Sequence, residues 1–383
     1  MIVYSGDLII DIIQNMIAVD LEITCDNNKE KFYINKNMDT VEITSKNNIT
    51  YEVSKDVVSV IRFLPETKEI CINGGEKSIT FNIKYAGKII NNNTINQVKK
   101  DWTELGFYLP WFPVNKRMNK SKFEINLTCI GGEDSKILYP LSKESLIDFS
   151  YPVFISNNHL MEEVVSGKTK VIIYFREKEG KELKDIIKNS ADKILTHFIE
   201  TFGKLEKDII LTVVISPRKK GGGYCRKNLI VLNESENNLD KTSYEQYFAH
   251  ELAHLWWTHG KMDSWEDWLN ESFAEYSLLS YVRSEYGEKT LNEKIKKYEE
   301  KIKGTPPIFN LDRGHEMSYL ALYPKGALIL NDLYGFLGEE EFNRLLKRVS
   351  ILKINNTSHL LEVIENEFSS EARKKLEWNL RNF

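Results

Sequence analysis

From its start to about residue 150, the chain alternates hydrophobic and polar residues with a period of two. The alternation is clearest in residues 41–45, 78–87 and 121–131, and clusters of Asn, Gly and Lys separate these segments. Such a pattern is typical of strands that bury one face and expose the other. Since no convincing amphipathic helix interrupts it, we expect an antiparallel β domain in this part of the chain.

An aromatic segment broken by prolines, residues 102–115, lies within this region. Its large apolar side chains favour burial, whereas its prolines interrupt regular strand pairing. We therefore interpret the segment as a loop that fills the core between sheets.

The hydrophobic period changes after about residue 155. Residues 169–176 are predicted to form a strand, and residues 181–202 a helix that ends at Gly203. Two further strands are predicted at residues 208–217 and 228–232. A mixed sheet covered by helices is therefore expected after the β domain.

The next stretch, residues 250–257, reads HELAHLWW and is predicted to lie on a helix. Thr242 and Ser243 offer N-cap hydroxyls, and a Glu and a Gln follow three residues after them, as in a capping box. A second helix is predicted to carry WLNESFAEY, residues 268–276, and to end at Gly287.

From Pro306 onward the chain is predicted to be helical. A helix is expected over residues 325–337, and a helical hairpin over residues 357–368 and 370–380.

Two histidines on the HELAHLWW helix have the spacing of metal ligands. His250 and His254 are four residues apart, so both rings leave the same face of the helix, separated by roughly 6 Å of rise. Both ring nitrogens can then reach one zinc ion at about 2.0–2.1 Å. Glu251 follows the first histidine and is placed to contact a metal-bound water without being a ligand, which is the HExxH arrangement of zinc hydrolases.

A catalytic zinc ion needs a third protein ligand, and the second helix offers one. Glu271 follows His254 with sixteen residues between them, enough for a loop and a turn of returning helix. Glu275 lies four residues further on the same face, where its carboxylate can accept the other N–H of a ligating histidine. Asn270, next to Glu271, is expected, like Glu275, to contact the metal ligands without binding the metal itself.

HELAHLW and WLNESFAEY, followed by Tyr323-Pro-Lys-Gly-Ala327, resemble the motifs of a zinc peptidase family. This is the family of the alanyl aminopeptidases and leukotriene hydrolase, family M1 of the gluzincins, which carries HELAHQW, WLNEGFAxY and Y-x-K-G-A in the same order. The resemblance implies that His250, His254 and Glu271 bind one zinc ion per chain. It implies that Glu251 is the general base and that Tyr323 stabilises the oxyanion.

The resemblance also implies an architecture for the α+β chain. A β sandwich or saddle would occupy residues 1–155, and a thermolysin-like catalytic domain would occupy residues 156–383. The last part of the catalytic domain, about residues 304–383, would form a helical subdomain without the large C-terminal helical domain of the longer family members.

The chain departs from the family upstream of the helices. The family carries G-x-M-E-N on an edge strand, and the glutamate of that motif holds the free amino group of the substrate. Here Gly221, Gly222, Gly223 and Tyr224 precede Cys225, which takes the place of the glutamate. We expect these five residues to bind substrate by strand addition, because a backbone without side chains permits close approach.

One further histidine is a candidate for substrate contact. His315 lies eight residues before Tyr323, on a loop where it could face the substrate. A loop histidine is more often simply exposed.

Composition limits the remaining classes of function. Charged residues make up 28% of the chain and the net charge is −4, which gives no electrostatic reason to expect binding to nucleic acid or to a membrane. No apolar run of 18 residues occurs, and Cys25, Cys71, Cys129 and Cys225 are scattered as reduced thiols would be. We expect a cytoplasmic protein whose partners are peptide substrates; its oligomeric state is not predicted.

Three functions remain open. The first is a zinc aminopeptidase that acts on peptides, with water activated by Glu251. The second is a zinc endopeptidase or other amide hydrolase that does not recognise a free amine, since Cys225 replaces the amine-binding glutamate. The third is a catalytically silent scaffold, which the intact Glu251 and Tyr323 disfavour.

Overall fold

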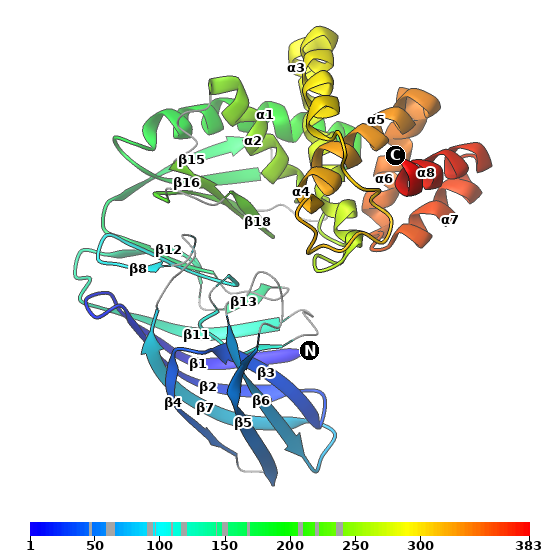
Figure 1. Ribbon diagram of the computed structural model, residues 1–383. Coiled ribbons are helices and arrows are strands. Elements are labelled where there is room, and N and C mark those ends of the chain that lie inside the picture. The colour runs from blue at the N-terminus through cyan, green and yellow to red at the C-terminus, as the bar shows by residue number, and fades with distance from the viewer. Residues whose placement is uncertain are drawn as a thin grey trace. The chain divides into compact units, whose positions relative to one another are not determined.

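The computed structural model describes most of the chain. The described residues are 1–45, 48–58, 66–89, 95, 97–108, 110–115, 121–142, 144–147, 152–166, 169–205, 210–218, 222–234 and 240–383. They divide into two compact units. One comprises Met1–Leu160 with Pro217–Gly221, and the other Met161–Ser216 with Gly222–Phe383. The first is built of strands and the second of a sheet and helices (Figure 1), which confirms the predicted α+β class.

The first unit contains three sheets, with strand orders β13-β11-β1-β2-β7-β4, β10-β3-β6-β5 and β12-β14-β9-β8. Their bounds are β1 Ile2–Asp11, β2 Met16–Cys25, β3 Lys29–Asn35, β4 Met38–Thr44, β5 Ile49–Val58, β6 Thr67–Gly74, β7 Ile79–Lys88, β8 Gln97–Val98, β9 Trp102–Leu105, β10 Val114–Asn115, β11 Ser121–Ile130, β12 Lys136–Tyr139, β13 Glu144–Ile147 and β14 Val153–Ser156.

One strand pair departs from the antiparallel pattern that we expected. β1 and β11 run parallel over their full length, from Ile2 opposite Ser121 to Asp11 opposite Ile130. The other pairs described in this unit are antiparallel. A short turn forces antiparallel pairing, but β1 and β11 are far apart in sequence, so no turn determines their relative direction.

The aromatic segment 102–115 fills the core of this unit, as predicted. Trp111 is fully buried, and Phe112 packs edge-on against Tyr4 with ring centroids 5.4 Å apart. The hydroxyl of Tyr4 donates a hydrogen bond of 2.7 Å to the carbonyl of Pro113. The segment also contributes β9 at its start, a short strand that the loop interpretation missed.

The second unit is built on a five-stranded sheet with the order β15-β16-β17-β19-β18. The strand bounds are β15 His159–Ser166, β16 Thr169–Arg176, β17 Ile210–Ser216, β18 Tyr224–Arg226 and β19 Leu229–Asn233. β16, β17 and β19 are parallel, and β18 pairs antiparallel with β19 at one edge. The mixed sheet and the strand at residues 169–176 agree with the sequence prediction.

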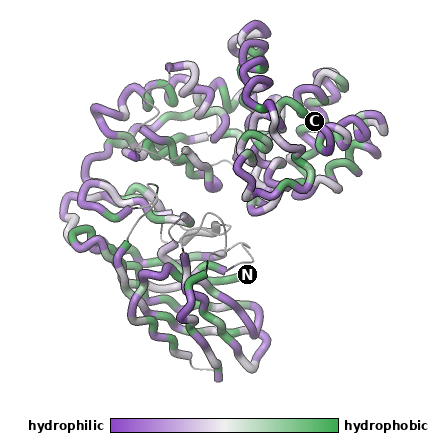
Figure 2. Tube along the Cα trace, viewed as in Figure 1, coloured by the Kyte–Doolittle hydropathy of each residue, from purple (hydrophilic) through white to green (hydrophobic). Residues whose placement is uncertain are grey.

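Helices pack on this sheet and extend beyond it. Their bounds are α1 Lys181–Phe202, α2 Lys241–Ala253, α3 Trp268–Lys301, α4 Ser318–Leu320, α5 Gly326–Leu337, α6 Glu339–Leu352, α7 Thr357–Glu367 and α8 Ser370–Asn382, with a 3₁₀ turn at Trp265–Asp267 and a π-helix at Ala321–Lys325. Hydrophilic and hydrophobic residues alternate along these helices (Figure 2), and the apolar sides form one core with the sheet. The predicted helix 181–202 and the predicted C-terminal hairpin are present within two residues of their expected ends.

Two details of helix ends matter for the site. The cap of α2 is Asp240, whose carboxylate accepts a hydrogen bond of 2.9 Å from the amide of Ser243, and not Thr242 or Ser243 as predicted. An aspartate two residues upstream competes successfully because Asp is at least as good a cap as Ser or Thr. α3 bends at Gly287, where φ is 80°, as its predicted end there implies.

No helix among the described residues is long and apolar enough to cross a membrane.

Candidate metal centre

Two helices bring the predicted ligands together. His250 lies in the last turn of α2, His254 directly follows that helix, and Glu271 lies in the first turn of α3. One ligand atom from each of these three residues lies within 4.8 Å of the others. The loop between the two helices therefore brings His254 and Glu271 together in space, although sixteen residues lie between them in the sequence.

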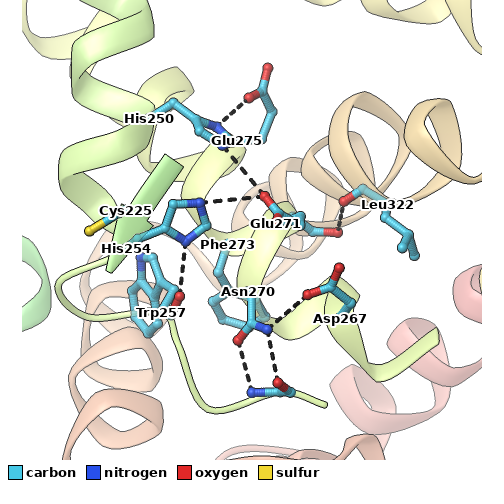
Figure 3. Close-up of polar contacts among 12 residues, drawn as sticks. Cys225, His250, His254, Trp257, Asp267, Asn270, Glu271, Phe273, Glu275 and Leu322 are labelled. Carbon is cyan, nitrogen blue, oxygen red and sulfur yellow. Dashed lines mark hydrogen bonds and ion pairs between the residues drawn. The ribbon is translucent and has the colours of Figure 1, made fainter. Parts of the chain in front are cut away.

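The separations of these atoms fit a tetrahedral metal site. The Oε2 atom of Glu271 lies 3.5 Å from Nε2 of His250 and 3.4 Å from Nε2 of His254 (Figure 3). Bonds of about 2.0–2.1 Å to a tetrahedral zinc ion would place two ligand atoms roughly 3.3–3.4 Å apart. The side chains therefore hold the spacing that such an ion requires.

The other nitrogen of each imidazole is already engaged. Nδ1 of His250 lies 2.7 Å from Oε2 of Glu275, and Nδ1 of His254 lies 3.0 Å from the carbonyl oxygen of Trp257 (Figure 3). A carboxylate and a carbonyl only accept, so an N–H is favoured at each Nδ1, and each Nε2 is the nitrogen at which a metal ion would replace a proton. Two imidazole nitrogens and the carboxylate of Glu271 thus converge on one point, which suits a cation.

The electrostatics of the cluster also favour positive charge among these side chains. Burial would lower the pKa of His250, but the carboxylates of Glu271 and Glu275 outweigh burial and raise that pKa well above its ordinary value. Burial would raise the pKa of Glu271, yet His254 and His250 hold it far below its ordinary value. With Glu251 nearby, three carboxylates share this buried volume with two imidazoles, so its local potential favours a divalent cation.

Glu251 is buried beside the ligand cluster and the edge of the sheet. A Cβ atom placed on Gly223 would come within 2.9 Å of its Oε1 atom and within 2.3 Å of the hydroxyl of Tyr247. A side chain at position 223 would therefore clash with the surroundings of this carboxylate, including the backbone carbonyl of Val231 at 2.8 Å. Burial raises the pKa of Glu251, against the opposing effect of His250 and His254.

Tyr323 extends from the π-helix Ala321–Lys325 toward the ligands. Its ring stacks on that of His250, with centroids 5.7 Å apart and planes 13° apart, and the centroid of the Tyr319 ring lies 4.4 Å from that of Tyr323. Burial and the nearby Glu271 raise the pKa of Tyr323 well above its ordinary value. The phenol therefore stays protonated and can donate a hydrogen bond.

The predicted substrate-binding residues are only partly grouped with the metal ligands. Gly223 lies beside Glu251, and Tyr224 and Cys225 lie in the edge strand β18. Gly222 precedes that strand, whereas Gly221 lies outside the described residues. Burial raises the pKa of Cys225, so its thiol is neutral.

Asn270 and His315 form hydrogen bonds with nearby backbone groups and not with the predicted metal ligands. The Oδ1 atom of Asn270 accepts a hydrogen bond of 2.8 Å from the backbone N–H of Gly260. Its Nδ2 atom donates to the carbonyl of Gly260 and to the carboxylate of Asp267, each at 2.9 Å (Figure 3). Asn270 thus shapes the loop between the two ligand helices. His315 is exposed, and its Nδ1 atom accepts a hydrogen bond of 3.1 Å from the amide of Met317.

The structure adds residues that sequence reasoning missed. Arg313 forms an ion pair of 2.9 Å with Asp267, and its charge acts on Tyr323 and Glu271. Tyr298 donates a hydrogen bond to Glu275 although 23 residues separate them in sequence. The bend at Gly287 makes this contact possible, since it turns the second half of α3 back along the first. In the sequence, this glycine was the feature that could have indicated the bend.

The comparisons with known proteins agree with this geometry. Residues 220–378 match the peptidase family M1 domain. Endoplasmic reticulum aminopeptidase 2 of Bos taurus is 34% identical over 135 residues, which are 32% of this chain and 14% of the relative. Probable aminopeptidase 1 of Sulfurisphaera tokodaii is 30% identical over 149 residues, 35% of this chain and 19% of the relative. The chain thus spans less than a fifth of the length of these curated relatives.

Solved structures share the whole fold. An M1 zinc metallopeptidase from Deinococcus radiodurans superposes with a TM-score of 0.68 at 15% identity, over 99% of this chain and 94% of that one. Native leukotriene A4 hydrolase from Saccharomyces cerevisiae gives 0.69 at 14% identity, over 98% of this chain and 65% of that one. Residues 220–378 are thus similar to the peptidase family M1 domain, and the chain shares the fold of these solved structures.

Proposed function

We propose that this chain is a zinc-dependent peptidase. The observation that carries the proposal is the convergence of the Nε2 atoms of His250 and His254 on Oε2 of Glu271, with Glu251 buried alongside. The family match and the names of the curated relatives support the same activity. One zinc ion per chain would be held by the three ligands.

A zinc ion held by His250, His254 and Glu271 would supply Lewis acidity, which would polarise the scissile carbonyl and lower the pKa of a water molecule to about 7. Glu251 accepts the proton of the attacking water and delivers it to the leaving amine. Its burial next to His250 and Glu271 suits this role, because a buried carboxylate takes up a proton more readily than an exposed one.

Tyr323 donates a hydrogen bond to the oxyanion that develops during attack. Its ring contacts the rings of both His250 and Tyr319, so the phenol is oriented before the substrate binds. Preorganised donors of this kind need no rearrangement during the reaction. Glu275 and the carbonyl of Trp257 keep the two imidazoles in the tautomer that binds metal.

We propose removal of N-terminal residues from peptides as the specific activity. The names of the curated relatives, endoplasmic reticulum aminopeptidase 2 and probable aminopeptidase 1, support this choice. One observation favours a second candidate, an endopeptidase or other amide hydrolase. Cys225 stands where the resembled motif has its amine-binding glutamate, and its buried, neutral thiol offers no charge to a substrate ammonium.

The two candidates are separated by one peptide library prepared with free and with acetylated N-termini. Zinc-loaded protein digests each form, Glu251→Gln protein serves as the blank, and mass spectrometry identifies the products. N-terminal ladders from the free form alone support the aminopeptidase. Internal cuts in both forms support the endopeptidase, and no cleavage above the blank contradicts a peptidase of either kind.

A further inference from the structure

Ser272 lies where the helix that carries Glu271 contacts the segment that carries Tyr323. Its side chain is 0% exposed, and its hydroxyl donates a hydrogen bond of 2.6 Å to the carbonyl of Leu322. The resembled motif WLNEGFA has glycine at this position, whereas this chain reads WLNESFA. The hydroxyl is therefore a departure within an otherwise matching motif.

The two helices approach each other closely at this serine. A Cβ atom placed on Gly326, the first residue of α5, would lie 1.8 Å from the Oγ atom of Ser272 and 2.5 Å from its Cβ atom. No side chain fits at position 326 while Ser272 keeps its position. The absence of a side chain on Gly326 thus leaves the space that the serine hydroxyl occupies.

The carbonyl that Ser272 holds belongs to irregular backbone. Leu322 lies in the π-helix Ala321–Lys325, and Pro324 within that helix has no N–H to donate. Single π turns of this kind have wider hydrogen-bond spacing than an α-helix and are frequent at functional sites. A side-chain donor from α3 restrains this carbonyl from outside the turn.

Tyr323 follows Leu322 directly, so the peptide plane that Ser272 restrains is the one from which Tyr323 extends. The neighbouring residue Glu271 is a proposed metal ligand, and the Tyr323 ring stacks on His250, another ligand. A single hydrogen bond thus joins the helix of the third ligand to the residue that donates to the oxyanion.

We propose that Ser272 is a positioning residue that aligns the hydroxyl of Tyr323 with the reacting carbonyl. The proposal rests on the proposed function, because Tyr323 acts on an oxyanion only if the chain hydrolyses peptides. A misplacement of about 1 Å at a catalytic group lowers rates by up to roughly 100-fold. Ser272 acts through Tyr323 and does not itself contact the substrate.

The test compares Ser272→Ala with a matched control, Ser280→Ala. Ser280 is another buried serine of α3, and its Oγ atom lies 2.9 Å from Nε2 of His197. Ser272→Ala is expected to lower kcat about tenfold with KM within about twofold of the wild type. Zinc content should stay at one ion per chain in both variants. A wild-type kcat in Ser272→Ala overturns the proposal.

A double-mutant cycle with Tyr323→Phe shows whether the effect passes through the phenol. When the hydroxyl of Tyr323 is absent, Ser272→Ala should cause no further loss of kcat, because the two residues act as one unit. An equal loss of kcat in both backgrounds overturns the proposal, since Ser272 would then act on another group.

Hydrogen exchange supplies a readout that does not depend on activity. The amides of residues 321–327 should exchange faster in Ser272→Ala than in the wild type or in Ser280→Ala, with or without zinc. If the wild type cleaves no peptide, the proposed function fails while this comparison still reports on the contact. Unchanged exchange in this segment overturns the positioning role in either case.

Discussion

The metal centre and the edge strand β18 belong to the same unit and differ in how their side chains are held. Each imidazole of the centre has its own partner on Nδ1, and Glu271 lies within 3.5 Å of both Nε2 atoms. On the edge strand, the thiol of Cys225 has one weak described hydrogen bond, 3.5 Å to the carbonyl of Lys227, and otherwise packs in the hydrophobic core. The preceding Gly222 and Gly223 have no side chains.

This difference has a consequence for function. A change in the metal centre disturbs several interlocked contacts at once, so the reaction type is strongly constrained. A change of the Cys225 side chain removes no strong polar contact, so we expect that substrate preference can vary at this position while the reaction is kept. Cys225, which departs from the resembled G-x-M-E-N motif, lies on this edge strand.

The largest effect is expected from Glu271→Ala. Loss of the third ligand should abolish zinc binding and peptide cleavage together. Zinc at 1,000 times its Kd should stabilise the wild type by about 4 kcal/mol and raise its melting temperature. The variant should melt at the same temperature with and without zinc. Glu300→Gln, an exposed change on the same helix, is the control, and a zinc-dependent shift in Glu271→Ala would contradict the assigned ligand set.

Tyr323→Phe should leave zinc binding intact and lower kcat by about 10²–10³, because one oxyanion donor is removed. The measurement is steady-state cleavage of a peptide that the wild type accepts. Tyr334→Phe, a half-buried tyrosine of α5, is the control and should keep the wild-type rate. Equal rates for Tyr323→Phe and the wild type would remove Tyr323 from the proposed machinery.

Glu275→Gln should weaken zinc binding by about 10–100-fold, as is typical when a partner of a ligating histidine is lost. The physical cause is the loss of the carboxylate that accepts the Nδ1 proton of His250 and makes that imidazole a better ligand. Competition with a chromogenic chelator measures the affinity. The control is Glu285→Gln. Glu285 lies on the same helix as Glu275 and forms an exposed ion pair with Lys193 of α1. Identical affinities in the two variants would show that Glu275 is dispensable.

The smallest effect concerns the edge strand. Cys225→Glu introduces the carboxylate of the resembled motif and should raise the preference for free over acetylated N-termini by about tenfold, as one charge-assisted hydrogen bond does. Cys225→Gln has nearly the same shape without the charge and is the control. If both variants change the ratio of kcat/KM values equally, charge at position 225 does not select the substrate amine.

Local patterns predicted the elements well, and they also picked out residues that the structure brings together. The helix at residues 181–202 follows from its apolar spacing, and the ligand pair His250 and His254 follows from their spacing on one helix. Glu271 and Tyr323 were reachable because the resembled motifs name them in order. In each case the information lies within a few neighbouring residues.

The missed features depend on distant contacts. The parallel pairing of β1 with β11 is not encoded in either strand's alternation. The contact of Tyr298 with Glu275 requires the path of the chain after Gly287, and the bond from Ser272 to Leu322 requires the crossing of two helices. A sequence pattern gives the faces of such elements and not their partners.

The most direct test of the account compares the wild type with Glu251→Gln, each purified with one zinc ion per chain, on a peptide with a free N-terminus. Removal of the general base should lower kcat by about 10²–10⁴ while zinc affinity changes little. That result would assign the reaction to Glu251 beside a bound metal. Equal rates in the two proteins, or no cleavage by the wild type above the buffer rate, would contradict the claim that this chain is a zinc peptidase.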